Sequence, residues 1–164
     1  TPVSSNAALP QPSSKIAMTS PTISCLIADP EEDVRNPIEA SVASAAAALG
    51  LEVTTTTVDD GRSALQALRS RAPRLVITEV LLDAVSGLQL LRHCRDSVDT
   101  SGARWIFLTS LNDDTDRYWA TLNDCDEYLA KPVSGVPLSA VLKKHLERIS
   151  RGEARSARRE ERAL

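Results

Sequence analysis

Residues 74–87, with the sequence RLVITEVLLDAVSG, contain a short apolar run that leads into a carboxylate. Residues 75–77 are continuously apolar and largely branched, and the run is too short for a helix. This pattern is typical of a strand covered on both faces, as in a parallel sheet. The chain turns polar by Glu79 and passes through a loop to Gly87, where a helical pattern begins. Because ligands gather at the carboxyl ends of strands in open α/β sheets, Glu79 is a candidate functional group.

The length and composition are those of one ordinary globular domain. The chain has 164 residues, of which 42% are hydrophobic and 25% charged. The net charge of −3 gives no reason to expect nucleic-acid binding. No stretch approaches the roughly 18 apolar residues of a membrane span and no signal peptide is visible, so we expect a cytoplasmic protein without a membrane partner. Three cysteines at wide spacings favour buried or free thiols over a metal or redox role.

The composition divides the chain into a tail, a central domain and a charged extension. Residues 1–22 are rich in Pro, Ser, Thr and Ala, which predicts a disordered N-terminal tail. Residues 23–149 carry strand and helix patterns. Residues 150–164 are rich in Arg and Glu, and they continue the last helix either as a solvated or frayed extension or as a coiled-coil lead into a partner. Glutamates interleave with these arginines, so DNA binding is not favoured.

Strand and helix patterns alternate five times within the central domain. The predicted strands cover residues 23–28, 52–58, 75–77, 105–108 and 127–130. The predicted helices cover residues 36–49, 63–71, 88–97, 113–123 and 137–149. The first helix is predicted to begin at Asn36 and Pro37, because Asn suits the N-cap, Pro the first turn and Glu39 the third position. Right-handed crossovers then imply an α/β three-layer sandwich with a parallel sheet between helices.

Four polar residues follow or end these strands. In a parallel sheet the carboxyl ends lie at one edge, so the alternation brings together Asp29, Glu79, Thr109 and Lys131. This clustering follows from the strand pattern alone. It predicts a polar pocket at the carboxyl edge of the sheet.

Five motifs occur in order along the central domain. They are Leu-Ile-Ala-Asp29, Asp60-Gly61 with Ala64-Leu65, Leu-Val-Ile-Thr-Glu79 with Gly87, Phe107-Leu108-Thr109-Ser110, and Asp126-Glu127-Tyr128-Leu129-Ala130-Lys131-Pro132. Together they resemble the receiver domain of bacterial two-component response regulators over about residues 23–149. The resemblance implies a flavodoxin-like (βα)5 fold with a parallel five-stranded sheet in the order 2-1-3-4-5. It also implies that a cis peptide commonly precedes the proline matching Pro132.

Two departures from the family pattern affect residues that take part in phosphorylation and metal binding. In the family, a phosphorylated Asp lies beside a Mg²⁺ ion held by an acidic pair after the first strand. Here Glu79 matches the phosphoacceptor and Pro30 matches the second acidic residue. The longer side chain moves the nucleophilic oxygen by more than the roughly 1 Å that can cost about 10²-fold in rate.

The second departure affects metal binding. Mg²⁺ requires near-octahedral oxygen ligands, and Pro30 replaces one of the carboxylates that supply them in the family. We expect the loop before Asn36 to be longer than usual, which would let Glu31 join Asp29 in place of the missing carboxylate. The pocket formed by these two residues is nevertheless expected to be vestigial, with no metal and no other cofactor.

The switch residues of the family are retained. In phosphorylated receivers, residues matching Thr109 and Lys131 contact the phosphoryl oxygens, and the aromatic residue matching Tyr128 turns inward. We hypothesise that Glu79 is a fixed anionic substitute for the phosphorylated state and pairs with Lys131. The alternative is a satisfied carboxylate in an inactive site, without influence on the switch. Phosphorylation adds about −1.5 to −2 charges, which a carboxylate imitates only in part.

All five aromatic residues lie within residues 105–128. The family binds partners through its fourth helix, fifth strand and fifth helix, and Arg117, Tyr118 and Trp119 lie on the predicted fourth helix. These residue types dominate interface hot spots. Adjacent helical residues point about 100° apart, so we expect one of the two rings to pack on the sheet while the other reaches solvent or a partner. Alternatively, both rings cover the rim of the core.

The sequence therefore predicts an atypical receiver domain that is not an enzyme. It would act in signal transduction by protein–protein interaction, independently of aspartyl phosphorylation. The alternative is a phosphorylatable receiver that uses an unusual acceptor, and Asp83, four positions after Glu79, is the nearest other carboxylate. A homodimer is left open.

Overall fold

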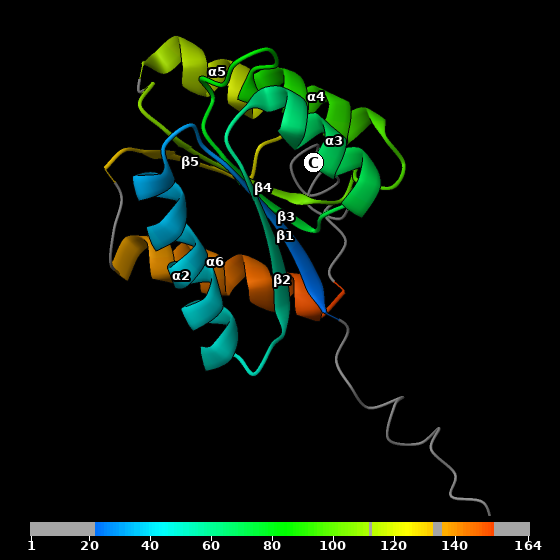
Figure 1. Ribbon diagram of the computed structural model, residues 1–164, viewed down its shortest axis with the longest axis vertical. Coiled ribbons are helices and arrows are strands. Elements are labelled where there is room, and N and C mark those ends of the chain that lie inside the picture. The colour runs from blue at the N-terminus through cyan, green and yellow to red at the C-terminus, as the bar shows by residue number, and fades with distance from the viewer. Residues whose placement is uncertain (1–21, 112, 133–135, 153–164) are drawn as a thin grey trace, which may run out of the picture.

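Five parallel strands form the centre of the molecule (Figure 1). The computed structural model describes residues 22–111, 113–132 and 136–152. Within these residues the strands are β1 Ile23–Ala28, β2 Val53–Val58, β3 Leu75–Thr78, β4 Arg104–Thr109 and β5 Glu127–Ala130. Their order in the sheet is β2-β1-β3-β4-β5, and every neighbouring pair is parallel. The predicted fold class and strand order are therefore confirmed.

Helices cover both faces of this sheet, and their labels follow Figure 1, where the numbering begins at α2. They are α2 Glu32–Ala48, α3 Gly61–Arg71, α4 Gly87–Asp96, α5 Asp114–Leu122 and α6 Val136–Ser150. Helices α2 and α6 pack on one face, and α3, α4 and α5 lie on the other (Figure 1). The predicted fourth and fifth helices thus correspond to α5 and α6. None of the helices in the described residues is both long and apolar enough to cross a membrane.

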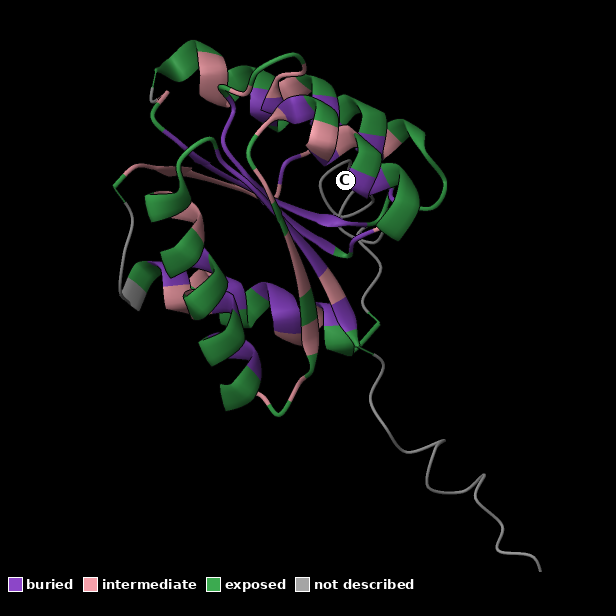
Figure 2. Cartoon of the chain, viewed as in Figure 1, coloured by how far each residue is buried: buried purple, intermediate pink, exposed green. Residues whose placement is uncertain are grey.

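The sheet buries a separate apolar core on each face (Figure 2). Strands β3 and β4 are buried at every position, as expected for central strands covered by helices on both sides. Along β3, Ile77 faces the α2 and α6 side, whereas Val76 faces the α3 and α4 side. The two edge strands are only partly buried. The central strands therefore give the carboxyl edge a rigid support.

The first helix begins earlier than the sequence predicted. Helix α2 starts at Glu32, because Glu31 is extended and its carbonyl accepts hydrogen bonds from the N–H groups of Val34 and Arg35. Pro37 consequently lies inside the helix and not at its start, at an exposed position near the N-terminus. Because only two residues separate Asp29 from the helix, the expected longer loop is also absent. The prediction of a helix start at Asn36 was wrong.

Two other helix starts depend on side-chain caps. Asp60 accepts a hydrogen bond from the N–H of Ser63, so α3 begins at Gly61, two residues before the predicted start. Ser86 and Gln89 form a reciprocal capping box at the start of α4. The other predicted elements agree with the structure to within one residue at each end. The peptide before Pro132 is cis, as the resemblance implied.

Two glycines fix the loop that connects β3 to α4. The N–H of Gly61 donates to the carbonyl of Asp83 at 3.0 Å, and a Cβ at this position would lie 1.8 Å from the carbonyl oxygen of Val85. At Gly87 a Cβ would lie 2.5 Å from the carbonyl oxygen of Glu79. Both approaches are closer than any side chain allows. The glycines therefore hold the loop directly behind the end of β3.

Two predicted segments lie mainly outside the described residues. These are residues 1–21 of the proposed disordered tail and residues 153–164 of the proposed charged extension.

A substitution at Gly61 should destabilise the protein through this loop. In Gly61→Ala the new methyl group overlaps the Val85 carbonyl, so the backbone must shift, and we expect a loss of at least about 3 kcal/mol in the free energy of unfolding. Gly102→Ala is the matched control, because no atom lies within 4 Å of its added Cβ, and it should change stability by less than about 1 kcal/mol. Urea denaturation of both variants measures the difference. Equal midpoints would contradict the role assigned to Gly61.

Candidate functional site: a carboxylate pocket at the strand ends

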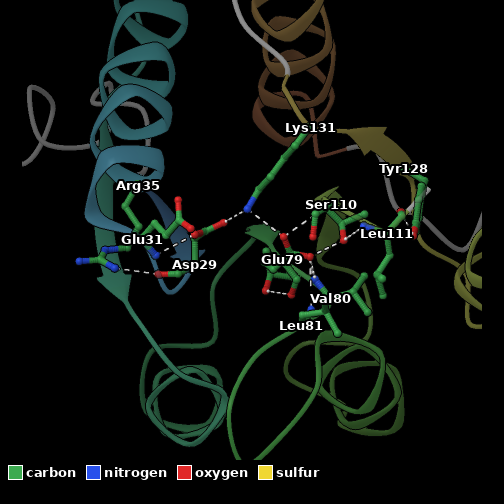
Figure 3. Close-up of polar contacts among 12 residues, drawn as sticks. Asp29, Glu31, Arg35, Glu79, Val80, Leu81, Ser110, Leu111, Tyr128 and Lys131 are labelled. Atoms are coloured by element: carbon green, nitrogen blue, oxygen red, sulfur yellow. Dashed lines mark hydrogen bonds and ion pairs between the residues drawn. The ribbon is translucent and has the colours of Figure 1, made fainter.

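The four residues predicted to gather at the carboxyl edge do so: Figure 3 shows Asp29, Glu79 and Lys131 together, and the hydroxyl of Thr109 donates to Glu79. Asp29 follows β1, Glu79 follows β3, Thr109 ends β4 and Lys131 follows β5. Asp29 and Glu79 are only 2% and 4% exposed, so two carboxylates are withdrawn from water. Such burial is unfavourable unless both groups are paired and hydrogen-bonded.

One oxygen of Glu79 is held by the loop that follows it and by the neighbouring strand. Its Oε1 accepts hydrogen bonds from the N–H of Val80 at 2.7 Å and the N–H of Leu81 at 3.2 Å. It also accepts a hydrogen bond from the hydroxyl of Thr109. Three donors therefore converge on this atom.

The other oxygen of Glu79 meets the opposite side of the pocket. Its Oε2 accepts a hydrogen bond from the N–H of Ser110 at 3.2 Å and lies 2.8 Å from Nζ of Lys131. The same ammonium lies 2.6 Å from Oδ2 of Asp29 (Figure 3). The remaining oxygen of Asp29 accepts a hydrogen bond from the N–H of Glu31 at 2.9 Å. Every carboxylate oxygen of the pocket consequently has a partner.

The pKa values reflect this pairing. Burial acts to raise the pKa of Glu79, but the hydrogen bonds from Lys131, Thr109 and Leu81 outweigh it, so the pKa lies below the ordinary value of 4.5. Burial acts to lower the pKa of Lys131, and its contacts with Asp29 and Glu79 raise it above the ordinary value. The Glu79–Lys131 pair is therefore ionised at neutral pH.

A Mg²⁺ ion, which the family resemblance implies, would have to compete with contacts that the carboxylates of the pocket already make. Both oxygens of Asp29 and both of Glu79 are already engaged, and Pro30 offers no side-chain ligand. Glu31 is exposed, and it contacts Asp29 through its backbone N–H. Among the described residues, no group of three His, Cys, Asp or Glu side chains is placed to hold a metal.

Hydrogen bonds continue from the pocket to the partly buried ring of Tyr128. Thr109 Oγ1 accepts a hydrogen bond from the N–H of Leu111 at 3.1 Å, and the hydroxyl of Tyr128 donates to the carbonyl of Leu111 at 2.7 Å. The ring of Tyr128 packs against Phe107 with 5.8 Å between centroids. Tyr128 is thus turned toward the body of the protein, and three hydrogen bonds link it to Glu79.

The guanidinium of Arg117 also lies over this ring. It lies 5.0 Å from the ring centroid of Tyr128, within the range of a cation–π contact, and Nη1 donates to the carbonyl of the same residue at 3.3 Å. Burial, followed by the charge of Asp116, raises the pKa of Tyr128 to about 12, so its hydroxyl keeps its proton. Arg117 contacts Tyr128 directly, which the sequence did not predict.

Both aromatic rings of α5 are exposed, in contrast to the expectation that one would pack on the sheet. Tyr118 is 59% and Trp119 is 48% exposed, and the buried residue of α5 is Ala120. A small residue faces the core here, so α5 can lie close to the sheet while its large rings point outward. Both rings therefore lie largely at the surface.

The alternative acceptor Asp83 lies on the exposed part of the loop after β3. The backbone carbonyl of Asp83 accepts hydrogen bonds from the N–H groups of Gly61 and Val85. No contact between the Asp83 side chain and Thr109 or Lys131 is found in the described part of the chain.

Sequence reasoning missed the backbone donors of the site, namely the N–H groups of Val80, Leu81 and Ser110. Any residue except proline supplies a backbone N–H, so these positions carry no side-chain signal. It also missed Arg35, whose Nη1 donates to the carbonyl of Asp29 at 2.7 Å. An Arg one turn into the following helix was the only available indication.

Comparisons with curated proteins identify transcriptional regulators that share this domain. The probable transcriptional regulator ycf27 of Galdieria sulphuraria is 32% identical over 126 residues, which cover 77% of this chain and 46% of that protein. The transcriptional regulatory protein AfsQ1 of Streptomyces coelicolor is 33% identical over 101 residues, covering 62% and 44%. The chain therefore spans about half the length of the curated relatives it matches.

Solved structures show the same fold. The signal receiver domain of an HD domain-containing protein from Pseudomonas fluorescens Pf-5 is 25% identical, with a TM-score of 0.69 over 81% of this chain and 100% of that chain. A putative response regulator from Chloroflexus aurantiacus J-10-fl is 26% identical, with a TM-score of 0.66 over 78% and 100%. The family model of the response regulator receiver domain matches residues 25–143. Because that match covers well over half of the chain, this protein belongs to the response regulator receiver domain family and is a receiver domain of two-component signalling.

Proposed function

We propose that this receiver domain signals by protein–protein interaction without being phosphorylated. The observation that carries the proposal is the Glu79 carboxylate, which accepts hydrogen bonds or an ion pair from five donors, including Thr109 and Lys131. In phosphorylated members of the family, residues matching these two contact the phosphoryl oxygens. In this protein the carboxylate of Glu79 contacts both Thr109 and Lys131.

The same geometry argues against phosphorylation at this position. A nucleophilic carboxylate oxygen needs a free lone pair in line with the phosphodonor, whereas Oε1 accepts three hydrogen bonds and Oε2 accepts two contacts. A divalent cation would also have to displace Lys131 from Asp29 and Glu79. Glu79 is proposed as a permanent anion in the pocket.

The inward Tyr128 supports an active-like state of the surface formed by α5, β5 and α6. Glu79 holds the hydroxyl of Thr109, and this hydroxyl accepts a hydrogen bond from Leu111, whose carbonyl in turn binds Tyr128. We propose this surface as the binding site for a cytoplasmic protein partner, with Trp119 among its contacts. The guanidinium of Arg117 lies over the ring of Tyr128, so we propose that Arg117 holds this ring in place and does not itself contact the partner.

The first prediction concerns phosphorylation itself. Incubation with acetyl phosphate and Mg²⁺ should leave the intact mass of the protein unchanged, because both oxygens of Glu79 are hydrogen-bonded and Lys131 is paired with Asp29 and Glu79. The double variant Pro30→Asp/Glu79→Asp restores the two family residues and serves as the positive control. A phosphoryl adduct on the unmodified chain would contradict the proposal, and its loss in Asp83→Asn would support the alternative acceptor.

The second prediction uses pH. Because the pKa of Glu79 is lowered by folding, its ionised form stabilises the protein fully above the ordinary value of 4.5, and this contribution disappears as the pH falls through the lowered value. Glu79→Gln breaks a buried pair but leaves Lys131 with Asp29, so we expect a loss of about 3 kcal/mol near pH 7.

Urea denaturation of both proteins between about pH 7 and about pH 3 measures this difference. The two free energies of unfolding should converge at acid pH. Other carboxylates titrate in the same range, but they are common to both proteins and cancel in the comparison. A difference independent of pH would show that Glu79 is not held as an anion.

The third prediction distinguishes a permanent anion that sets the switch from an inactive carboxylate. Glu79→Ala and Thr109→Val should each change the NMR signals of the Tyr128 ring and the Leu111 amide, because both break the hydrogen-bond route between them. Glu31→Ala is the control, since it removes an exposed carboxylate at the same edge. Unchanged Tyr128 signals in Glu79→Ala would favour the inactive site.

A further inference from the structure

Helix α5 presents an exposed apolar strip to solvent. Tyr118, Trp119 and Leu122 are 59%, 48% and 55% exposed, and the two rings touch edge to face with 5.8 Å between centroids. Leu122 follows one turn later, near the positions of both rings on the helix surface. Three large apolar side chains gathered on one helix differ from the scattered exposed residues that soluble domains normally carry.

The first turn of the same helix is acidic. Asp113, Asp114 and Asp116 lie within four positions, and the carboxylate of Asp113 accepts a hydrogen bond from the N–H of Asp116 at 2.8 Å. Local burial, followed by the neighbouring Asp113, raises the pKa of Asp116. The carboxylates therefore repel one another, and a cation brought beside them would be attracted.

The only basic residue of α5 does not balance this charge at the surface. Arg117 lies over the ring of Tyr128 and donates to its backbone carbonyl. Its cation is thus directed toward β5. The exposed side of α5 combines an acidic first turn with an apolar strip.

We propose that this face binds a basic amphipathic helix of a partner protein. The partner's apolar side chains would cover Tyr118, Trp119 and Leu122, and its Lys or Arg side chains would lie opposite the acidic turn. This inference rests on the proposed function, to which it adds the chemistry of the partner. Association through electrostatic complementarity would make binding fast, salt-sensitive and selective against acidic segments.

Charge also argues against other occupants of this face. A second copy that placed its α5 against this one would bring two acidic helices together, because neither has an outward base and each is followed by Asp124. Nucleic acids and anionic membrane surfaces would be repelled by the acidic turn. A basic protein segment matches both the charge and the apolar strip.

Trp119 provides a direct reporter for the test. The chain has two tryptophans, and Trp105 is fully buried, so a change in fluorescence on binding arises at Trp119. The probes are synthetic peptides of about 18 residues, long enough to form a helix, with leucine on one face and lysine elsewhere. A second peptide replaces lysine with glutamate, and a third keeps lysine but lacks the leucine face.

We expect the lysine–leucine peptide to bind at least about tenfold more tightly than either of the others and to weaken as salt is added. Tyr118→Ala and the pair Asp113→Asn/Asp116→Asn should each reduce its affinity by about tenfold. The matched controls are Val98→Ala, which removes an apolar side chain that is 92% exposed elsewhere, and Asp96→Asn/Asp99→Asn, which removes exposed acidic charge elsewhere. These controls should bind like the unmodified chain.

Equal binding of the basic and acidic peptides would overturn the inference, as would equal losses in the control variants. A concentration-dependent dimer that Trp119→Ala abolishes, measured by sedimentation, would assign the face to a second copy instead. None of these measurements depends on phosphorylation. If the lysine–leucine peptide does not bind and the protein's mass is unchanged after phosphodonor treatment, the basic partner is rejected. The proposed phosphorylation-independent role is then unaffected.

Discussion

A single ammonium group allows two carboxylates to lie out of water at the carboxyl edge of the sheet. An unpaired carboxylate at the depth of Asp29 or Glu79 would cost several kcal/mol, and Lys131 lies within 2.8 Å of both. Because this contact fixes Oε2 of Glu79, the other oxygen is directed at Thr109. The hydroxyl of Thr109 has one proton, and donating it to Glu79 leaves its lone pairs for the N–H of Leu111. The orientations of the Glu79 carboxylate and the Thr109 hydroxyl thus follow from one ion-paired cluster.

The consequences of this cluster reach the surface through β5. The hydroxyl of Tyr128 donates to the carbonyl of Leu111, and its ring contacts both Phe107 and Arg117. Arg117 belongs to α5, which means that the helix with the exposed aromatic strip is joined to the same ring. A contact made deep in the pocket is therefore connected to the position of an outer helix by groups that touch in sequence. Each connection is a hydrogen bond or a ring contact.

The strand pattern alone was sufficient to predict the sheet and the meeting of Asp29, Glu79, Thr109 and Lys131. Parallel order is a strong constraint, because buried central strands and alternating helices leave few topologies. The start of α2 was mispredicted because local cap preferences pointed to Pro37, whereas the helix could begin earlier and keep this residue at an exposed position near its N-terminus. The outward rings of α5 were mispredicted because helical geometry says which residues share a face but not which face meets the sheet. Backbone donors and the inward turn of Arg117 depend on tertiary contacts, which no local pattern records.

The two departures from the family pattern act on the same electrostatic problem. An acidic pair together with a phosphoacceptor places three carboxylates in one pocket, and such a charge needs a divalent cation. Replacing one of them with Pro30 leaves Asp29 and Glu79, and their combined charge of −2 is half balanced by Lys131. The extra methylene of Glu79 then brings the carboxylate to the donors of the loop and of the next strand, which distribute the remaining charge over neutral dipoles. We therefore propose that the two substitutions act together, since one removes a negative charge and the other lengthens the side chain that reaches these donors. Their joint presence supports the proposal that the pocket signals without phosphorylation.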